Sequence, residues 1–462
     1  MDLRRAGLEL TLLAVAVLLM GLTPYPQAFV TAMQQAEVHC VVREYGLALD
    51  AYRRAARLTP ESSLPWLQRG EILLCQHRFV PATVAFREAE QLGGKEMALL
   101  GLGESLAGQG DWAAALQVWL RAQALAPNDA RVYLGLGRGS IAQSRFDQAA
   151  RYLVQALERQ PTAGEAAVAH ALLGRLLAGD DPGQAADHFQ QAGDEDMLAV
   201  LADAEPAPAR RALLLGAAFL QRNELTLAHR ELERAVALAP ADLEAYAYLA
   251  HTLDLLGETV AAEAWLNRAL ELDPDSALAY YFLGVHHRQV GNVERAQAAL
   301  WEALLRDPEN AALRVEMAEA FLDLHDYPHA EEWYRGAVEV APDDIEFHLL
   351  LVRFYLDHLY RVEEGGLPAA QAAVSLAPGD ARPYDLLGWA YCLTGRQVDA
   401  ERSLVQALAL DPELVSAHYH LGSLYAHIGR RDLARQHLQR AADLDVGGTY
   451  RARAETLLSE FE

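Results

Sequence analysis

The sequence predicts an all-α fold, an α-solenoid of about twelve helix-turn-helix repeats preceded by one N-terminal hydrophobic helix. Three observations predict it: prolines recur every 34 residues, small residues recur at two fixed places in each period, and an apolar run precedes the first period. Such a period is typical of units that bury a core only against their neighbours. An array of this kind can extend one core along 462 residues, of which 52% are apolar and 22% charged.

The N-terminal segment is predicted to be an uncleaved membrane anchor. Arg4 and Arg5 precede an apolar run over residues 6–22, about the shortest length that crosses a bilayer. A cleaved signal peptide and a buried leading helix are the alternatives, but the best cleavage site, at residues 30–32, would lie inside the first repeat helix. The positive-inside rule then predicts a single-pass membrane protein with a cytoplasmic N-terminus and extracytoplasmic repeats. The opposite orientation is the alternative.

The repeat period is visible in the prolines. In the C-terminal half they recur at a spacing of 34 residues, with one interval of 36, and this series is Pro240, Pro274, Pro308, Pro342, Pro378 and Pro412. Upstream, Pro127 and Pro161 are again 34 residues apart, while Pro60 and Gly94 hold the same phase. The array is therefore expected to begin directly after the anchor.

Each period also carries two small residues seven apart, with a large apolar residue between them. The first small position is Ala48, Ala82, Ala115, Ala149, Ala185, Ala228, Ala262, Ala296, Ala330, Ala400 and Ala434. The second is alanine in all units: Ala55, Ala89, Ala122, Ala156, Ala192, Ala235, Ala269, Ala303, Ala337, Ala373, Ala407 and Ala441. The large position is Tyr52, Phe86, Trp119, Leu153, Phe189, Leu232, Leu266, Leu300, Tyr334, Leu404 and Leu438, with Ala370 the exception. Because antiparallel helices approach closely only over small side chains, this pattern predicts two packed helices per unit.

Most first helices also carry a Leu-Gly pair, as at residues 102–103, 136–137 and 387–388, where glycine permits close packing at some cost in helix stability. Together these positions resemble the tetratricopeptide-repeat (TPR) pattern W-x2-L-G-x2-Y, A-x3-F and P. Residues 384–391 and Trp66-x3-Gly70 are close copies. The resemblance covers about residues 29–446 and implies a right-handed superhelix, in a protein of the membrane-anchored bacterial type.

The expected organisation follows from the phase of the repeats. It comprises a cytoplasmic tip and anchor (1–28), units one to five (29–194), an irregular connector that fits no unit (195–208), units six to twelve (209–446) and a C-terminal capping helix (447–462). The tenth unit has an enlarged loop at residues 358–366, interpreted either as a binding feature or as length drift.

Composition excludes several classes of function. A net charge of −25 would repel phosphate backbones, so no nucleic-acid partner is expected. The three cysteines form no C-x-x-C pair. Cys40 and Cys75 occupy nearly equivalent places in successive repeats, and they are interpreted as two buried small apolar residues, with a disulfide as the alternative.

No catalytic or metal-binding motif stands out. The P-loop, G-x-G-x-x-G, H-E-x-x-H and G-x-S-x-G patterns are absent, and the repeats leave no room for a catalytic domain, so we expect no enzyme and no cofactor. One histidine cluster, at residues 325–329 with Glu331 and Glu332, has a spacing that a metal ion could use, but it lies at the turn between paired helices. The histidines at 286–287 and 418–420 likewise flank repeat positions. They are interpreted as solvated or satisfied histidines, and no metal site is expected.

In the TPR family the first helix of each unit lines a concave groove through its second, fifth, ninth, twelfth and thirteenth positions, and the resemblance implies the same here. Carried onto this sequence, these positions are Glu71, Glu104 and Arg138 in the N-terminal half. In the C-terminal half they are His251, Asp254, Tyr281, Arg288, Glu319, Arg353, Asp385, Trp389, Tyr419 and His427. The alternatives are that charges such as Glu319 and Arg353 pair between neighbouring helices, and that Tyr281 and Trp389 pack in the interior.

The function implied is a non-catalytic, membrane-anchored scaffold or adaptor that binds a protein or peptide in this groove. The mixed apolar and acidic lining suits a peptide with apolar anchors and some basic residues. The lysine/asparagine/arginine set with which some family members grip a C-terminal carboxylate is absent. The alternative function is a recruiting or regulatory subunit of a separate enzyme, for example a glycosyltransferase or an envelope-biogenesis complex. The oligomeric state is left open.

Overall fold

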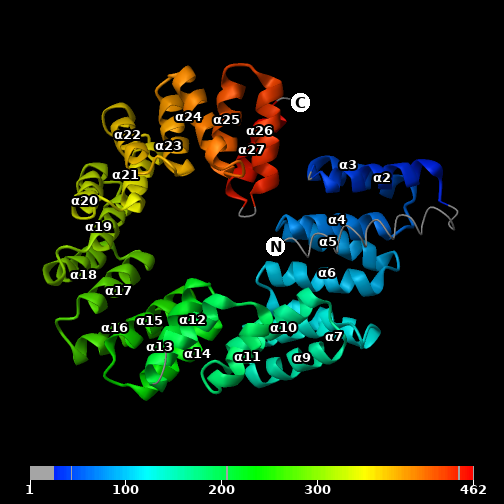
Figure 1. Cartoon of the computed structure of the whole chain (residues 1–462), viewed down its shortest axis with the longest axis horizontal. Helices are drawn as coiled ribbons and strands as arrows, with labels where there is room; N and C mark the ends of the chain where they lie inside the picture. The colour runs from blue at the N-terminus through cyan, green and yellow to red at the C-terminus, as the bar shows by residue number, and fades with distance from the viewer. Residues whose placement is uncertain (1–24, 43, 204–206, 446–447, 461–462) are drawn as a thin grey trace. The chain divides into compact units, whose positions relative to one another are not determined.

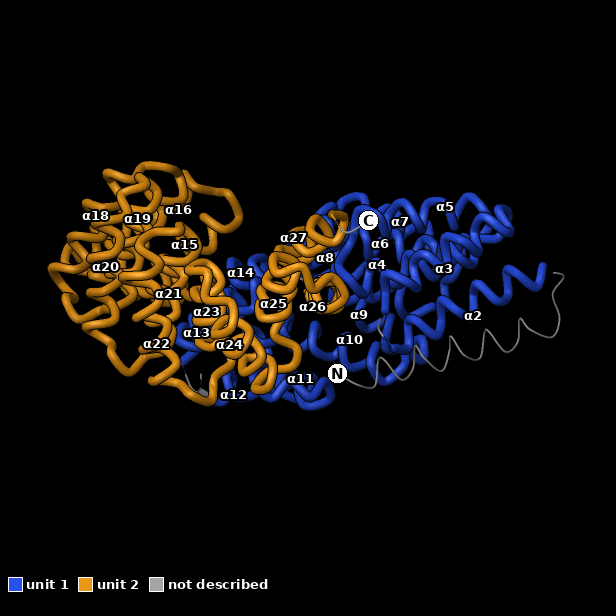
Figure 2. The backbone as a smooth tube through the Cα atoms, turned by 90° about the horizontal axis from the view of Figure 1, so that it is seen from above, with its two compact units in different colours: residues 1–231 blue, residues 232–462 orange. Residues whose placement is uncertain are grey.

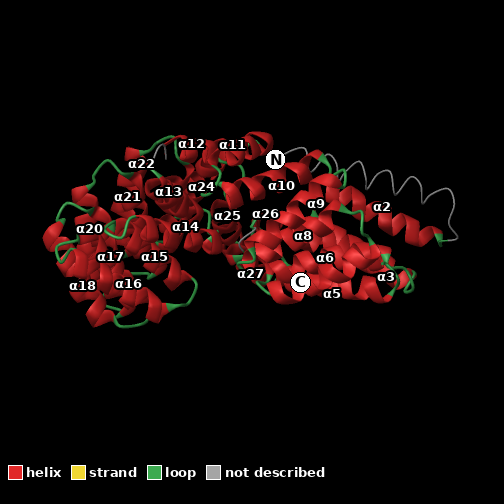
Figure 3. Ribbon diagram, turned by 90° about the horizontal axis from the view of Figure 1, so that it is seen from below, coloured by secondary structure: helices red, strands yellow, loops and turns green. Residues whose placement is uncertain are grey.

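The computed structural model describes residues 25–42, 44–203, 207–445 and 448–460. Within these residues the chain forms 26 α-helices and one π-helix, and they contain no strand (Figure 3). The chain divides into two compact units, called unit 1 (residues 1–231) and unit 2 (residues 232–462), which are described separately (Figure 2). The helix-turn-helix repeats keep their ordinal numbers, from the first unit to the twelfth. The division falls inside a helix, α14.

In chain order, all of these α-helices except α12 (Glu195–Asp203) and α27 (Thr449–Ser459) fall into twelve helix-turn-helix pairs (Figure 1). The first six are α2 (Gln27–Val41) with α3 (Tyr45–Leu58), α4 (Leu64–Cys75) with α5 (Phe79–Gln91), α6 (Lys95–Gly108) with α7 (Trp112–Leu125), α8 (Ala130–Ala142) with α9 (Phe146–Glu158), α10 (Ala163–Leu177) with α11 (Pro182–Ala192), and α13 (Pro208–Gln221) with α14 (Leu225–Leu238). The last six are α15 (Leu243–Leu255) with α16 (Thr259–Leu272), α17 (Ala277–Gln289) with α18 (Val293–Arg306), α19 (Ala311–Asp323) with α20 (Tyr327–Val340), α21 (Ile345–Asp357) with α22 (Leu367–Leu376), α23 (Ala381–Leu393) with α24 (Gln397–Leu410), and α25 (Val415–His427) with α26 (Arg431–Leu444). The predicted number of helix-turn-helix units is confirmed.

The predicted anchor, residues 6–22, lies outside the described residues. Among the helices that the structure does describe, none combines the length and the apolar character needed to cross a bilayer.

The periodic small residues form the helix crossings. Every alanine at the first small position is fully buried, and at the second only Ala192 is partly exposed. The large residue between them packs against the glycine of the paired first helix, as Leu404 does against Gly388 and Leu438 against Gly422. A Cβ atom built on Gly388 would lie 2.5 Å from Cγ of Leu404, closer than real contacts allow. Close packing therefore requires glycine there, as the sequence predicted.

In the tenth unit the large residue of this crossing lies on the first helix and the small residue on the second. Its second helix carries Ala370 where other units have a large residue, and its first helix carries Val352 where they have glycine or alanine. Both residues are fully buried and belong to one hydrophobic cluster with Leu349 and Leu386. The exception in the sequence pattern is thus compensated within the same helix pair, because the volume is supplied from the opposite side.

The recurring prolines have a second role besides ending helices. The residue six positions after the proline donates a hydrogen bond to the proline carbonyl in five units, and these donors are Tyr133, Tyr246, Arg314, His348 and His418. The turn that joins one unit to the next is thereby fixed to the first helix of the following unit.

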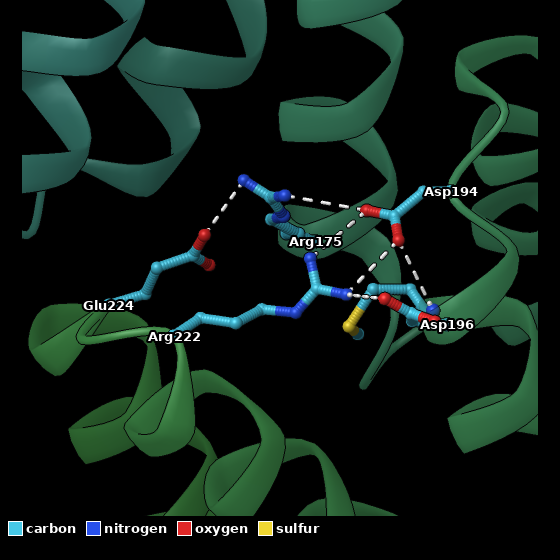
Figure 4. Close-up of polar contacts among 6 residues, drawn as sticks. Arg175, Asp194, Asp196, Arg222 and Glu224 are labelled. Carbon is cyan, nitrogen blue, oxygen red and sulfur yellow. Dashed lines mark hydrogen bonds and ion pairs between the residues drawn. The ribbon is translucent and has the colours of Figure 1, made fainter. Parts of the chain in front are cut away.

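The segment expected to be irregular contains a nine-residue helix of its own, α12 (Glu195–Asp203), whose Met197 is fully buried. Asp194 accepts hydrogen bonds from the backbone N–H of Met197 and from Arg222, at 3.3 and 3.2 Å, and lies 3.4 Å from Arg175 (Figure 4). Arg175 also pairs with Glu224 at 2.8 Å. This network joins α12 to α10 and to the turn after α13, and thereby holds α12 in place although it matches no repeat.

The enlarged loop of the tenth unit is tied to the preceding unit. Arg361 has a left-handed backbone (φ 44°) and begins a π-helix, η1 (Val362–Gly366), which leads into α22. Its guanidinium donates to both carboxylate oxygens of Glu331, at 2.9 and 3.0 Å, and the Tyr355 hydroxyl donates to the same carboxylate at 2.7 Å. In the twelfth unit Arg430 and Tyr425 contact Glu401 in the same way, at 3.1 and 2.8 Å. The loop thus retains a contact that a regular unit also makes.

The C-terminal helix, α27 (Thr449–Ser459), packs on α25 and α26 and buries Ala454. Arg451 fixes it, because its Nε donates to the Ala442 carbonyl and its backbone N–H donates to Asp445, both at 2.8 Å.

The cysteines depart from the sequence interpretation. Of the described residues, all three cysteines are unbridged; Cys40 is partly buried and Cys75 is exposed. The interpretation as two buried residues is wrong for Cys75, because it is the last residue of α4 and faces solvent there.

Candidate functional site

The predicted groove residues of unit 2 all belong to first helices. Figure 1 shows that, within this unit, α17, α19, α21 and α23 follow the inner side of the curve and their partners α18, α20, α22 and α24 the outer side. Three groups of side-chain contacts join successive first helices of this unit.

The first group, the acidic cluster, consists of Arg288 on α17 and Glu316, Glu319 and Asp323 on α19. The Arg288 guanidinium lies 3.3 Å from Glu316, 3.7 Å from Glu319 and 3.7 Å from Asp323. The Tyr334 hydroxyl also donates to Glu319. Burial raises the pKa of Glu316, against the opposing effect of Arg288. One arginine thus faces three acidic residues, and the cluster keeps an excess of negative charge.

Tyr281 lies beside this cluster. It is partly exposed on α17 and packs edge-on against Phe282, with ring centroids 4.9 Å apart. Burial, together with the neighbouring Glu316 carboxylate and against the opposing effect of Arg288, raises the pKa of Tyr281 to about 12. The phenol is therefore a hydrogen-bond donor at neutral pH, facing an acidic surface.

The second group is a buried acid–histidine pair between α15 and α17. Nδ1 of His286 lies 2.8 Å from Oδ1 of Asp254. Burial raises the pKa of Asp254, and the hydrogen bond to His286 opposes that effect. His251, also on α15, packs against Phe282 at 5.2 Å, and burial lowers its pKa. Asp254 is thus an interior residue and not a groove-lining one as predicted, because its carboxylate points to the neighbouring helix.

The third group, the aromatic cluster, consists of Trp389, Tyr419, His420 and Tyr450. The Trp389 indole stacks on His420 with centroids 4.5 Å apart and an interplanar angle of 15°. Tyr419 lies between His420 and Tyr450, at 5.7 and 5.3 Å. His420 is held by Asp385, with Nδ1 to Oδ1 at 2.7 Å. Trp389 and Tyr419 remain partly exposed, so the cluster offers an apolar surface whose rings are already fixed.

The remaining predicted residues join no group. Arg353 and His427 are exposed on α21 and α25. The alternative pairing of Glu319 with Arg353 does not match the contacts of Glu319, which are with Arg288 and Tyr334. In unit 1, Glu104 and Arg138 do pair between the first helices α6 and α8, at 2.7 and 3.0 Å. Burial raises the pKa of Glu71, against the effect of Arg131.

Several contributing residues were missed by the sequence reasoning. Glu316 and Asp323 lie three before and four after Glu319, so helical spacing could have placed them on the same face. His286 and His420, which the sequence interpreted as solvated or satisfied histidines, are the buried partners of Asp254 and Asp385, and only the contact between successive helices reveals this pairing. Tyr450 follows the last repeat, and no repeat position points to it.

Comparison with known proteins assigns the family. Models described as tetratricopeptide repeat match residues 287–354 and, separately, residues 100–139, 213–277 and 386–448, together about half of the chain. The chain belongs to the tetratricopeptide-repeat family. Repeats of this family are typical of protein–protein interaction scaffolds. A search of curated proteins gives no match.

Solved structures similar to the TPR chain include other TPR proteins. Yeast Tom70 has 17% identity over 94% of this chain and 96% of its own, with a TM-score of 0.45. Residues 41 to the end of MamA from Desulfovibrio magneticus RS-1 have 25% identity over 36% of this chain and 94% of their own, with a TM-score of 0.32. YrrB, titled a TPR protein with an unusual peptide-binding site, has 24% identity over 40% of this chain and 95% of its own, with a TM-score of 0.32.

Proposed function

We propose that this TPR protein is a non-catalytic scaffold that binds a peptide segment of a partner protein along the first helices of unit 2. The partner segment carries an apolar side chain for the aromatic cluster and basic residues for the acidic cluster. The observation that carries the proposal is the acidic cluster itself, in which Arg288 balances only part of the charge of Glu316, Glu319 and Asp323.

An incoming arginine or lysine would complete this charge balance. Its side chain would exchange water for carboxylates that are already partly desolvated, where charge-assisted hydrogen bonds are stronger than on an open surface. The net charge of −25 would also attract a basic segment over a longer range.

The aromatic cluster supports an apolar anchor point. Aromatic residues that are rigid before binding lose little conformational freedom on contact, and they are common among residues that dominate interface energies. Trp389 meets this condition because His420 stacks on one face of the indole and Asp385 holds His420 in place.

Photocrosslinking tests the site. The photoreactive residue p-benzoylphenylalanine replaces Trp389 in one variant and Trp301 in a control; Trp301 lies on the second helix α18 and is 51% exposed. A discrete crosslinked partner from the Trp389 position alone is the expected result. The purified partner should then bind the Trp389→Ala and Glu319→Gln variants at least tenfold more weakly, and the Trp301→Ala variant unchanged. Equal crosslinking from both positions, or unchanged affinity of Trp389→Ala, would refute the proposal.

The proposal includes attachment to a membrane by residues 6–22, with the repeats on the extracytoplasmic side. Its support is the apolar run after Arg4 and Arg5 and the lack of a further arginine or lysine before Arg43. Carbonate-resistant membrane fractionation of the full chain and of a chain lacking residues 2–24, with reporter fusions at the C-terminus, tests both points. Release of the full chain by carbonate would refute the anchor, and a reporter active only in the cytoplasm would refute the orientation.

A further inference from the structure

A second cluster of polar side chains in unit 2 has the composition of a metal site. Glu263 lies on α16, and His286 and His287 lie on α17. One potential ligand atom from each of the three residues lies within 4.8 Å of those from the other two. In the part of the chain that the structure describes, no other group of three histidine, cysteine or acidic residues meets this condition.

We propose that Glu263, His286 and His287 bind a divalent transition-metal ion of the zinc class, with a fourth coordination position open to solvent. Two histidines and one carboxylate are a known ligand set of zinc sites that keep such an open position. The same set also suits cobalt, and soft thiolate ligands are not needed for either ion.

Asp254 supplies the support that a histidine ligand requires. Nδ1 of His286 lies 2.8 Å from Oδ1 of Asp254, and the two side chains are only 3% and 2% exposed. With Nδ1–H donating to the carboxylate, Nε2 of His286 keeps its lone pair for a metal ion. Ligand histidines are commonly oriented by a carboxylate on the second ring nitrogen, and the added negative charge favours a cation.

His287 gives an independent indication. Its side chain is 7% exposed, and its Nδ1 is buried without a hydrogen-bond partner. A buried polar atom without a partner costs about 1–3 kcal/mol. His287 therefore carries a ring nitrogen without a partner close to the other potential ligands. Coordination of a metal ion by this imidazole would supply the missing interaction.

The geometry needs only a small adjustment. Metal–ligand bonds of about 2.0–2.2 Å place ligand atoms about 3.3–3.6 Å apart in a tetrahedron, so atoms that now lie within 4.8 Å of one another would close by up to about 1.2–1.5 Å. Glu263 is partly exposed at the edge of the cluster, and its flexible side chain can make most of this movement and give the ion access. Arg295 is a positive charge near His287 that would oppose the binding of a cation, but it is exposed and its effect is therefore screened by solvent.

The buried pair of Asp385 and His420 provides a matched control. Its Nδ1–Oδ1 distance is 2.7 Å, nearly the same as in the Asp254–His286 pair, but among the described residues no further histidine, cysteine or acidic side chain completes a group of three potential ligands with it. A variant of His420 therefore removes an equally buried, carboxylate-held histidine without touching the proposed ligands.

Titration of the untagged full chain with Co²⁺ tests the proposal, read by visible d–d absorption and confirmed by displacement with Zn²⁺. We expect one equivalent of Co²⁺ in a four- or five-coordinate spectrum, with affinity at least tenfold lower in Glu263→Gln and in His287→Gln and unchanged in His420→Gln. Asp254→Asn, a positioning change, should lower affinity by about 10–100-fold. Circular dichroism verifies the fold of each variant. Because Glu263 is partly exposed, Glu263→Gln keeps the test valid if His287→Gln fails to fold. The proposal is overturned by octahedral Co²⁺ only, or by Glu263→Gln binding like the native chain.

Discussion

Replacing Val352 by Gly and Ala370 by Leu would give the tenth unit the residues that the eleventh unit has at the same crossing. In the eleventh unit Gly388 faces Leu404, whereas in the tenth the large residue comes from the first helix. If the crossing requires one large and one small residue, and not a particular order, the two replacements should compensate each other. Each single replacement should be much more damaging than the pair.

The magnitudes follow from the burial of both sites. Val352→Gly removes a fully buried side chain, which costs about 1.5–3 kcal/mol, and adds about 1 kcal/mol for glycine within a helix. Ala370→Leu forces three carbon atoms against a filled crossing and costs about 1–3 kcal/mol. In the double variant the leucine fills the space that valine leaves, so mainly the helix cost of about 1 kcal/mol remains. These figures give a coupling of about 2.5–6 kcal/mol in favour of the pair, which begins at the upper end of the range of about 0.5–3 kcal/mol seen for residues in contact.

Hydrogen exchange measured by mass spectrometry is the suitable assay, because a repeat array need not unfold in one step. Opening free energies of α21 and α22 would be compared in the native chain, the two single variants and the double variant. Additive effects, with the double variant the least stable of the four, would refute the reasoning. Unchanged protection of α23 and α24 in the single variants would show that the damage remains local.

Three further predictions concern other contacts. Glu331→Ala leaves the Tyr355 hydroxyl without its acceptor, and should raise hydrogen exchange in residues 358–366 by an amount equivalent to about 1–3 kcal/mol. Glu401→Ala should destabilise its own contact by less, because the Glu401 side chain is 34% exposed and that of Glu331 only 9%. Burial, with a smaller effect of His418, lowers the pKa of His437 from its ordinary 6.5 to about 4. The neutral ring therefore contributes fully to stability above pH 6.5, and this contribution is lost as the pH falls toward 4. In thermal unfolding, His437→Gln should reduce the loss of stability between pH 6.5 and 4, and an equally steep profile would contradict the prediction. Asp194→Asn should raise exchange in α12, whereas Asp196→Asn, at a side chain that is 91% exposed, should not.

The fold could be predicted because its signal lies in small buried residues at a fixed period. Ala400, Ala407 and the glycines of the first helices leave little choice of packing, since a larger side chain would collide with the partner helix. Even the irregular member, Ala370, stands where the sequence marked an exception. The short helix α12 could not be predicted, because its order comes from an arginine–aspartate network between elements that the repeat pattern does not relate.

The groove residues were predicted less well than the crossings, and for a physical reason. A repeat position places a Cα atom on a face but does not say which neighbour a long or ionisable side chain reaches. Glu319 contacts Arg288 on the preceding first helix, where the sequence suggested Arg353 on the following one. Asp254 and Asp385 turn to histidines on the next first helix and are removed from the surface.

These two buried pairs show that the same contact between first helices can have different chemical surroundings. Asp254 with His286 and Asp385 with His420 join consecutive first helices with the same ring nitrogen and almost the same distance. What differs is the residue placed beside the imidazole: His287 and Glu263 in one case, the Trp389 indole in the other. The helix spacing thus presents an oriented histidine twice, and a neighbouring side chain decides whether it serves a metal ion or supports an aromatic contact surface. If Trp389→Ala created no Co²⁺ affinity at His420 while Glu263→Gln weakened binding at His286 at least tenfold, experiment would establish that the repeats fix the histidine and that the neighbouring side chains determine its role.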